Sequence, residues 1–176
     1  CEQRLAEHLR GLILDLRFNG GGSLGVAIEM ADLFLKSGVI VSTKGRATAE
    51  ERYTARSEGT LPDFPMIVLA NDQSASASEI VAGALSDNGR AQVLGTRTFG
   101  KGIVQAMYRL PSGSGQLKIT EQYYYLPSGR CIQRTDESTD WGVDPAPGMY
   151  VPMTNDEYRE MFRARRGDEI IRTGKV

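Results

Sequence analysis

Histidine and cysteine are scarce in this sequence of 176 residues, which contains one histidine, His8, and two cysteines, Cys1 and Cys131. Zinc and other transition metals are usually held by several such side chains, so the composition excludes a metal site rich in histidine or cysteine. A Ser-His-Asp triad would have to use His8, close to the first residue. Two cysteines leave the redox compartment, and the redox state of Cys1 and Cys131, undecided.

The sequence also lacks a long apolar run and an excess of charge of one sign. No run approaches the roughly 18 apolar residues of a membrane-spanning helix, so we expect no such span. Lysine and arginine together number 21, and aspartate and glutamate number 22, which gives a formal net charge of −1. This balance argues against a strongly basic nucleic-acid-binding protein. The chain starts with cysteine and shows no signal peptide, so we interpret it as a fragment or a mature form.

The overall composition is that of a globular domain. Hydrophobic residues make up 40% and charged residues 24% of the chain, and at this length a core forms without disulfides or metal ions. We expect one domain over residues 1–150, followed by an extension over 151–176 with a short helix capped by Thr154 or Asn155. Glycine is frequent, with 20 residues, which predicts tight turns and close backbone approaches.

Four short apolar runs predict buried strands, and two stretches with a helical period predict helices. The expected strands cover residues 12–16, 39–43, 66–70 and 92–96. The first helix begins after Ser23 and is stopped by Gly38, and the second ends at Asn88 and Gly89. The order strand, helix, strand, strand, helix, strand indicates an α/β core, in which ligands gather at the strand-to-helix junctions.

The rest of the chain is less regular. Residues 103–125 predict an antiparallel pair of strands with a turn at 111–115. Residues 44–63 are polar without a clear period and are interpreted as a surface loop. Residues 131–153 contain several prolines, which suggests an extended tail.

The first strand-to-helix junction carries the run Asn19-Gly20-Gly21-Gly22. Glycines leave backbone N–H groups open, and the N-terminus of the following helix favours negative charge. The run therefore forms either an oxyanion hole or anion cradle, or a tight turn without further role. Its spacing excludes a phosphate-binding P-loop.

The second junction carries Ser74, Ser76 and Ser78 just before a helix. Either one of these serines is a nucleophile at the helix N-terminus, or they serve the turn and the helix start, with Ser76 or Ser78 as the cap. The spacing does not say which serine would be the nucleophile. Lys101 lies between two glycines. It is either a solvated surface charge or, because histidine is scarce, the base that takes the serine proton, which requires burial to favour the neutral amine.

These segments resemble the carboxyl-terminal processing proteases, the tail-specific serine peptidases of family S41. The resemblance rests on DLRFNGGG at 15–22, NDQSASASEIVAGAL at 71–85, GTRTFGKGIVQ at 95–105, QYYYLPSGRCIQR at 122–134 and WGVDPAPG at 141–148. Together these matches span about residues 10–150, so residues 1–150 are expected to form the catalytic core. The resemblance implies an α/β spiral core of the ClpP/crotonase type, with strand-helix repeats and an antiparallel strand pair.

The resemblance also implies roles for individual residues. Ser76, the middle serine, matches the nucleophile, and Lys101 matches the general base. Gln105 matches the residue that orients the lysine amine, and residues four apart share a strand face, so we expect Gln105 to reach back to Lys101. Gly22 and Ala77 match the two backbone positions of the oxyanion hole. The family uses no metal or cofactor, so none is expected.

Partners and location follow from the resemblance as well. The expected partners are polypeptide substrates recognised through apolar C-termini, and the expected location is extracytoplasmic or periplasmic. The oligomeric state stays open. Family members usually carry an upstream PDZ domain and an N-terminal helical region, and nothing in this sequence resembles either. Gly20 stands where the family often has proline or serine, which is expected to make the loop more flexible.

Three alternatives stay open. A non-catalytic ligand- or peptide-binding module on the same fold would not need Ser76, Lys101 and Gln105 together. A crotonase-like acyl-CoA enzyme also uses glycine-rich oxyanion donors but relies on carboxylates. The third is a scaffold or regulatory fragment that is inactive without its upstream domain. Covalent labelling of Ser76 by a serine-directed reagent would argue against the first two.

Overall fold

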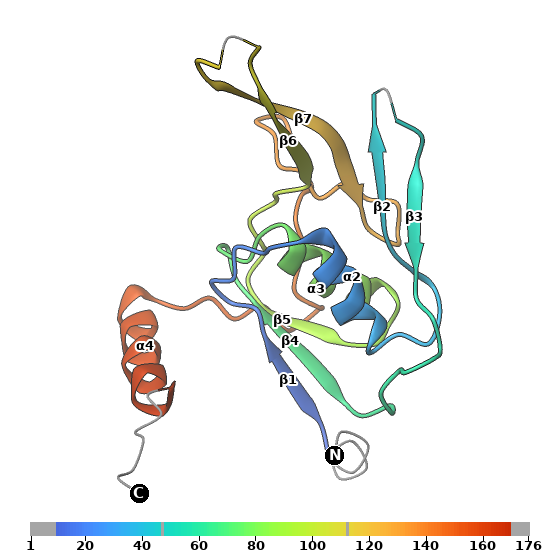
Figure 1. Ribbon diagram of the computed structural model, residues 1–176. Coiled ribbons are helices and arrows are strands. Elements are labelled where there is room, and N and C mark those ends of the chain that lie inside the picture. Colours follow the sequence, from blue (N-terminus) through green and yellow to red (C-terminus); the bar gives the residue numbers. More distant parts are fainter. Residues whose placement is uncertain (1–9, 47, 112, 170–176) are drawn as a thin grey trace, which may run out of the picture.

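The computed structural model describes residues 10–46, 48–111 and 113–169, so His8 and Cys1 lie outside the described residues. The strands are β1 (Leu12–Asp15), β2 (Val39–Gly45), β3 (Glu51–Thr54), β4 (Met66–Ala70), β5 (Gln92–Gly95), β6 (Ile103–Arg109) and β7 (Gln116–Tyr125). The helices are α2 (Leu24–Asp32), α3 (Ala77–Asp87) and α4 (Asn155–Glu169). The fold is α/β, as the sequence predicts (Figure 1).

A parallel sheet in the order β1-β4-β5 forms the centre of the fold, and α2 and α3 pack together beside it (Figure 1). Val68 of β4 and Val93 of β5 are fully buried in one core with Ile80 and Leu85 of α3. Parallel strands have to be joined by crossover segments, so the two strand-to-helix junctions fall at the same edge of this sheet.

An antiparallel sheet in the order β3-β2-β7-β6 stands next to the helices. The predicted pair at residues 103–125 is confirmed as β6 and β7, and the strand predicted at 39–43 is confirmed as β2. β2 pairs with β3 and β7 in this second sheet. The interpretation of residues 44–63 as a surface loop is wrong in part, because this stretch contains β3. β3 is an edge strand with mostly exposed side chains, so no apolar alternation marks it in the sequence.

Residues 131–153 pack along the core, which corrects the expectation of a tail. Ile132 and Val143 are buried within this segment. Near its end, Val151 N–H donates to the Gly95 carbonyl at 2.8 Å, so the segment covers the edge of β5. The helix expected next is confirmed as α4, and Thr154 caps it through reciprocal hydrogen bonds with Glu157.

The first helix is shorter than predicted. Ser23 occupies the N-cap position as expected, but α2 ends at Asp32 with Leu33 as the C-cap, well before Gly38. Phe34 and Leu35 are nevertheless buried, so the apolar pattern continues beyond the end of the helix. No helix within the described ranges combines the length and apolar character needed to cross a membrane.

Candidate active site

The carboxyl ends of two neighbouring parallel strands bring the glycine-rich and serine-rich junctions together. β1 leads into residues 16–22, β4 leads into residues 71–76, and the two strands pair directly. The Ala75 N–H donates to the Asn19 carbonyl at 3.0 Å. Both predicted segments therefore meet at one edge of the sheet, where ligands bind in α/β folds.

Ser76 differs from the two neighbouring serines in its backbone and its exposure. It lies at the N-cap of α3 with φ 58° and ψ −118°, a conformation that is rare outside glycine. Ser74 and Ser78 are buried, whereas Ser76 is half-buried. The Ser74 hydroxyl is used internally, since it donates to the Leu16 carbonyl at 2.8 Å. Strained residues gather at functional sites, so the geometry favours Ser76 as the reactive serine.

The glycine-rich segment packs directly against the start of α3. Gly21 has φ +89°, and a Cβ atom there would lie 2.5 Å from the Ala75 carbonyl oxygen and 2.7 Å from the Ala77 nitrogen. Gly22 and Ala77 line the same pocket, and within the described part of the chain neither backbone N–H has a hydrogen-bond acceptor. Two open N–H groups beside Ser76 are the donors that an oxyanion hole requires.

The close approach at Gly21 leads to a stability prediction. Gly21→Ala is expected to lower the free energy of unfolding by about 1–3 kcal/mol, because alanine is strained at this φ and its Cβ meets the α3 backbone. Gly20→Ala is the matched control, since a Cβ there has no atom within 4 Å. Chemical denaturation of both variants measures the difference. Equal stabilities would contradict the packing of Gly21 against Ala75 and Ala77.

Glu79 is a fully buried carboxylate that connects the serine to the lysine loop. Its Oε1 accepts hydrogen bonds from Thr98 Oγ1 and from the Gly100 N–H, both at 2.6 Å. Its Oε2 accepts hydrogen bonds from the N–H groups of Ser76 and Lys101, both at 2.8 Å. One carboxylate thus fixes the backbone of Ser76 relative to the backbone of Lys101.

Glu79 is absent from the predicted site residues, although part of its role has a sequence signal. A glutamate three residues after a serine at a helix start is the pattern of a capping box, and this pattern predicts the bond to the Ser76 N–H. Glu79 also accepts hydrogen bonds from Thr98, Gly100 and Lys101, which lie about 20 residues further along the chain. No local sequence pattern predicts these bonds.

The lysine loop packs tightly on residues 132–134, as its flanking glycines predict. The Arg134 N–H donates to the Gly100 carbonyl at 2.8 Å, and the Gly102 N–H donates to Oε1 of Gln133 at 2.9 Å. A Cβ at Gly102 would lie 2.6 Å from the Gln133 nitrogen, so only glycine permits this approach without a shift. The Lys101 backbone is therefore held from two sides.

The backbones of Ser76 and Lys101 are linked through Glu79, but the side chains of Ser76, Lys101 and Gln105 do not contact one another through hydrogen bonds among the described residues. The Lys101 side chain is exposed, and among the described residues its amine has no hydrogen bond to Ser76 or Gln105. Gln105 instead donates from Nε2 to Thr120 Oγ1 at 3.3 Å. The pairing of β6 with β7 is irregular between Val104 and Gln105, which interrupts the alternation behind the expected Gln105–Lys101 contact.

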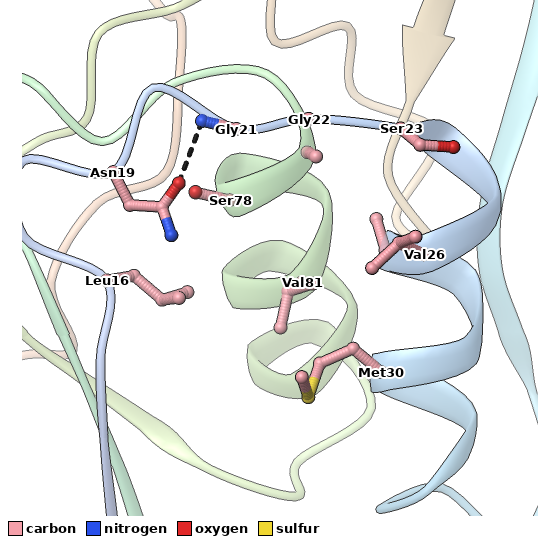
Figure 2. Close-up of a pocket in the computed structure, with 11 residues that line it drawn as sticks. Leu16, Asn19, Gly21, Gly22, Ser23, Val26, Met30, Ser78 and Val81 are labelled. Carbon is pink, nitrogen blue, oxygen red and sulfur yellow. Dashed lines mark hydrogen bonds between the residues drawn. The ribbon is translucent and has the colours of Figure 1, made fainter.

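A pocket of about 160 Å³ opens beside the glycine-rich segment, between α2 and α3 (Figure 2). Val26 and Met30 of α2 lie across it from Val81 of α3. At the rim, Oδ1 of Asn19 accepts the Gly21 N–H at 2.9 Å. The facing aliphatic side chains make this pocket suitable for an apolar group.

An ion pair lies between β1 and the glycine-rich segment. Arg17 donates from Nε to Oδ1 of Asp15 at 3.0 Å and from Nη2 to Oδ2 at 2.8 Å. Partial burial raises the pKa of Asp15, but the hydrogen bonds and charge of Arg17 outweigh it, so this pKa lies below its usual value. The hydrogen bond to Asp15 raises the pKa of Arg17. The pair is therefore ionised at neutral pH and holds the start of the segment.

Metal ligands and cysteines add little to this site. In the part of the chain that the structure describes, no three His, Cys, Asp or Glu side chains are grouped so that they could hold a metal ion. Cys131 is half-buried and forms no disulfide with any of the described residues. Cys1 lies outside the described residues.

Comparisons with known sequences agree on one family. The sequence profile described as peptidase family S41 matches residues 2–146. The carboxy-terminal-processing protease of Bartonella bacilliformis is 47% identical over 147 residues, which are 82% of this chain and 33% of that protein. The carboxyl-terminal-processing protease of Picosynechococcus sp. is 42% identical over 162 residues, which are 90% of this chain and 39% of that protein.

Solved structures agree with the sequence relatives. The photosystem II D1 C-terminal processing protease matches with a TM-score of 0.75 and 32% identity, covering 86% of this chain and 37% of that one. Mature CPAF, at 16% identity and a TM-score of 0.73, shares the fold. The chain spans 33% and 39% of the length of the two curated relatives named above. Because the family profile matches most of its residues, this chain belongs to peptidase family S41.

Proposed function

We propose that this chain is the catalytic core of a serine endopeptidase that cleaves polypeptides near their C-termini. The observation that carries the proposal is the strained backbone of Ser76 at the start of α3, held by Glu79 next to the Lys101 loop. A serine nucleophile and a lysine base need a defined separation, and the shared carboxylate fixes the separation of their two backbones. The names of the family relatives support the C-terminal preference.

In the proposed mechanism, the neutral Lys101 amine takes the proton of Ser76 Oγ while Oγ attacks the carbonyl carbon of the scissile peptide bond. The N–H groups of Gly22 and Ala77 donate to the oxyanion that forms, and loss of one such donor costs roughly 2.7–4 kcal/mol. The Lys101 ammonium then gives its proton to the amine as the peptide bond breaks. The remaining part of the substrate stays bound to Ser76 as an acyl-enzyme. Lys101 then takes a proton from a water molecule, whose oxygen attacks the ester carbonyl carbon, and returns that proton to Ser76 Oγ as the ester bond breaks.

The exposed position of Lys101 gives the substrate a part in this mechanism. A lysine is a base in its neutral form, and removal of water from the amine favours that form. A polypeptide lying across the Lys101 loop would cover the exposed side chain. Gln105 is proposed to orient the amine in that complex, which requires its side chain to leave Thr120.

The apolar pocket supports the proposed substrate class. It opens next to Gly22 and Ala77, so a carbonyl oxygen bound there would place the neighbouring substrate side chain between α2 and α3. Val26 and Met30 supply apolar walls for that side chain. Cleavage of an unstructured protein that ends in apolar residues is therefore expected to exceed cleavage of the same protein ending in charged residues.

Covalent labelling tests the proposed function. A fluorophosphonate probe reacts with activated serines, and peptide mass spectrometry locates the modified residue. We expect labelling at Ser76 that is lost in Ser76→Ala and kept in Ser78→Ala. A full-length protein that binds apolar C-terminal peptides but is neither labelled nor able to cleave them would be a binding module, and the peptidase proposal would be wrong.

A further inference from the structure

The C-terminal helix α4 contacts the residue that precedes the glycine-rich segment. The Phe18 ring packs edge-on against Tyr158 with ring centroids 5.2 Å apart, and at a tilt of 51° against Phe162 with centroids 4.7 Å apart. Tyr158 and Phe162 lie one turn apart on α4, which Figure 1 shows to one side of the parallel sheet, away from the antiparallel sheet. A helix from the end of the chain thus touches the segment that leads to Gly22.

Phe18 has a backbone conformation that needs support. Its φ of 60° lies in the left-handed region, which bulky residues rarely adopt and keep only where their surroundings hold them. Its N–H donates to Oδ1 of the buried Asn71 at 2.9 Å, while its ring is held by the two aromatic side chains of α4. The backbone and the side chain of Phe18 are therefore fixed by different parts of the molecule.

The position of Phe18 is transmitted to the proposed oxyanion hole by the residues that follow it. Asn19 accepts the Ala75 N–H at its carbonyl and the Gly21 N–H at its Oδ1. Gly21 in turn packs against the Ala77 nitrogen. Because these contacts restrict the backbone from Asn19 to Gly21, a shift of Phe18 would move the Gly22 N–H relative to the Ala77 N–H.

Further contacts hold α4 in the same place. Arg165 Nη1 lies 3.4 Å from Oδ2 of Asp15, the carboxylate that also pairs with Arg17. Tyr158, together with Met153, lines a cavity of about 60 Å³ that is also bordered by Asn71. One helix thus contacts Phe18, the ion pair before it, and the surroundings of the amide that binds the Phe18 N–H.

We propose that α4 positions the oxyanion hole: Tyr158 and Phe162 hold Phe18, and through it the Gly22 N–H, in the geometry that binds the oxyanion. This inference rests on the proposed peptidase function. Tyr158 and Phe162 are positioning residues, because they act on the site through Phe18 and the loop that follows it.

The test uses the full-length protein and the double variant Tyr158→Ala/Phe162→Ala. We expect kcat to fall roughly 10- to 100-fold, as for a small displacement of a catalytic group, with KM little changed. Two inhibitors of the same peptide sequence give the second readout. A peptide aldehyde forms a hemiacetal with Ser76 and places its oxygen in the oxyanion hole, whereas the matching peptide alcohol does not. Affinity for the aldehyde should fall by the same factor as kcat, and affinity for the alcohol should stay unchanged.

Matched variants separate positioning from a general loss of structure. Glu160→Ala changes an exposed residue of the same helix, and we expect it to behave as the wild type. Tyr158→Phe keeps the ring and should keep the wild-type ratio of aldehyde to alcohol affinity. If the double variant lacks a cooperative unfolding transition, the ratio is measured in Phe162→Ala, because Phe162 as a residue is 43% exposed in the intact protein.

Two results would overturn the inference. One is a folded double variant with wild-type kcat and a wild-type affinity ratio, and the other is an effect confined to KM. A wild-type protein that is neither labelled at Ser76 nor active would overturn the peptidase function itself, together with this inference. The two failures are therefore distinguishable in the wild-type control.

Discussion

Lys101→Ala is expected to lower kcat/KM for polypeptide cleavage by about 10³-fold or more. General acid–base catalysis typically contributes about 10²- to 10⁴-fold to the rate. Without the amine, no group in the proposed mechanism accepts the Ser76 proton. Lys101→Arg should be as damaging, because a guanidinium stays protonated at the pH of the assay and cannot act as a base. Steady-state kinetics of both variants measure the loss, with Ser76→Ala as the background.

The stability of the Lys101 variants separates catalysis from folding. The Lys101 side chain is exposed, and its backbone, not its amine, is bound by Glu79. Surface substitutions of this kind change stability by about 0.5 kcal/mol or less, so both variants should unfold as the wild type does. Lys118→Ala removes another exposed lysine and should retain activity. Full activity in Lys101→Ala would contradict a catalytic serine–lysine pair. Activity in Lys101→Arg but not in Lys101→Ala would indicate that the reaction needs a positive charge at this position rather than a base.

The elements that the sequence predicts well carry their own local signal. The apolar run at 66–70 is β4 without a change of boundary, and α3 ends just before the expected Asn88 and Gly89. β3 carries no such signal, because an exposed edge strand needs no apolar alternation. The sheet to which β2 belongs depends on its pairing with β7, and a pairing between distant segments leaves no pattern in either one.

The candidate site likewise has features that the sequence predicts and features that depend on tertiary contacts. The resemblance predicts Ser76 as the nucleophile and Lys101 as the base. The parallel pairing of β1 with β4 explains why the glycine-rich and serine-rich junctions meet. The position of the Gln105 side chain depends on an irregular pairing in β6, which the sequence does not show. Glu79 has the sequence pattern of an ordinary helix cap, and its second role depends on the tertiary approach of the lysine loop.

The second large effect is expected at Glu79, whose carboxylate accepts four hydrogen bonds in the protein interior. Glutamine has nearly the same shape but only one oxygen. With its Nε2 in the place of Oε2, the amide would meet two N–H donors, those of Ser76 and Lys101. With Nε2 in the place of Oε1, it would still meet the Gly100 N–H. Neither orientation of the amide satisfies all the groups that the carboxylate binds.

Glu79→Gln is therefore expected to lower the free energy of unfolding by about 2–4 kcal/mol, since hydrogen bonds to a charged acceptor contribute about 1.5–3 kcal/mol each. Activity should fall further, by roughly 100-fold in kcat, because the Ser76 and Lys101 backbones lose their common acceptor. Thermal unfolding and kinetics below the transition measure the two effects separately. Glu29→Gln makes the same change at an exposed position of α2 and should be nearly neutral.

The comparison of Glu79→Gln with Thr98→Val identifies what the carboxylate does for activity. Thr98→Val removes one donor to Oε1 but leaves the Ser76 and Lys101 N–H groups bound to Oε2. We expect Thr98→Val to lose stability, because the hydroxyl also accepts the Val143 N–H at 2.7 Å, and to retain most of its kcat when folded. If the two variants lost kcat in equal proportion to stability, Glu79 would serve the fold alone. A larger kcat loss in Glu79→Gln at matched stability would show that its bonds to Ser76 and Lys101 set the geometry of the reaction.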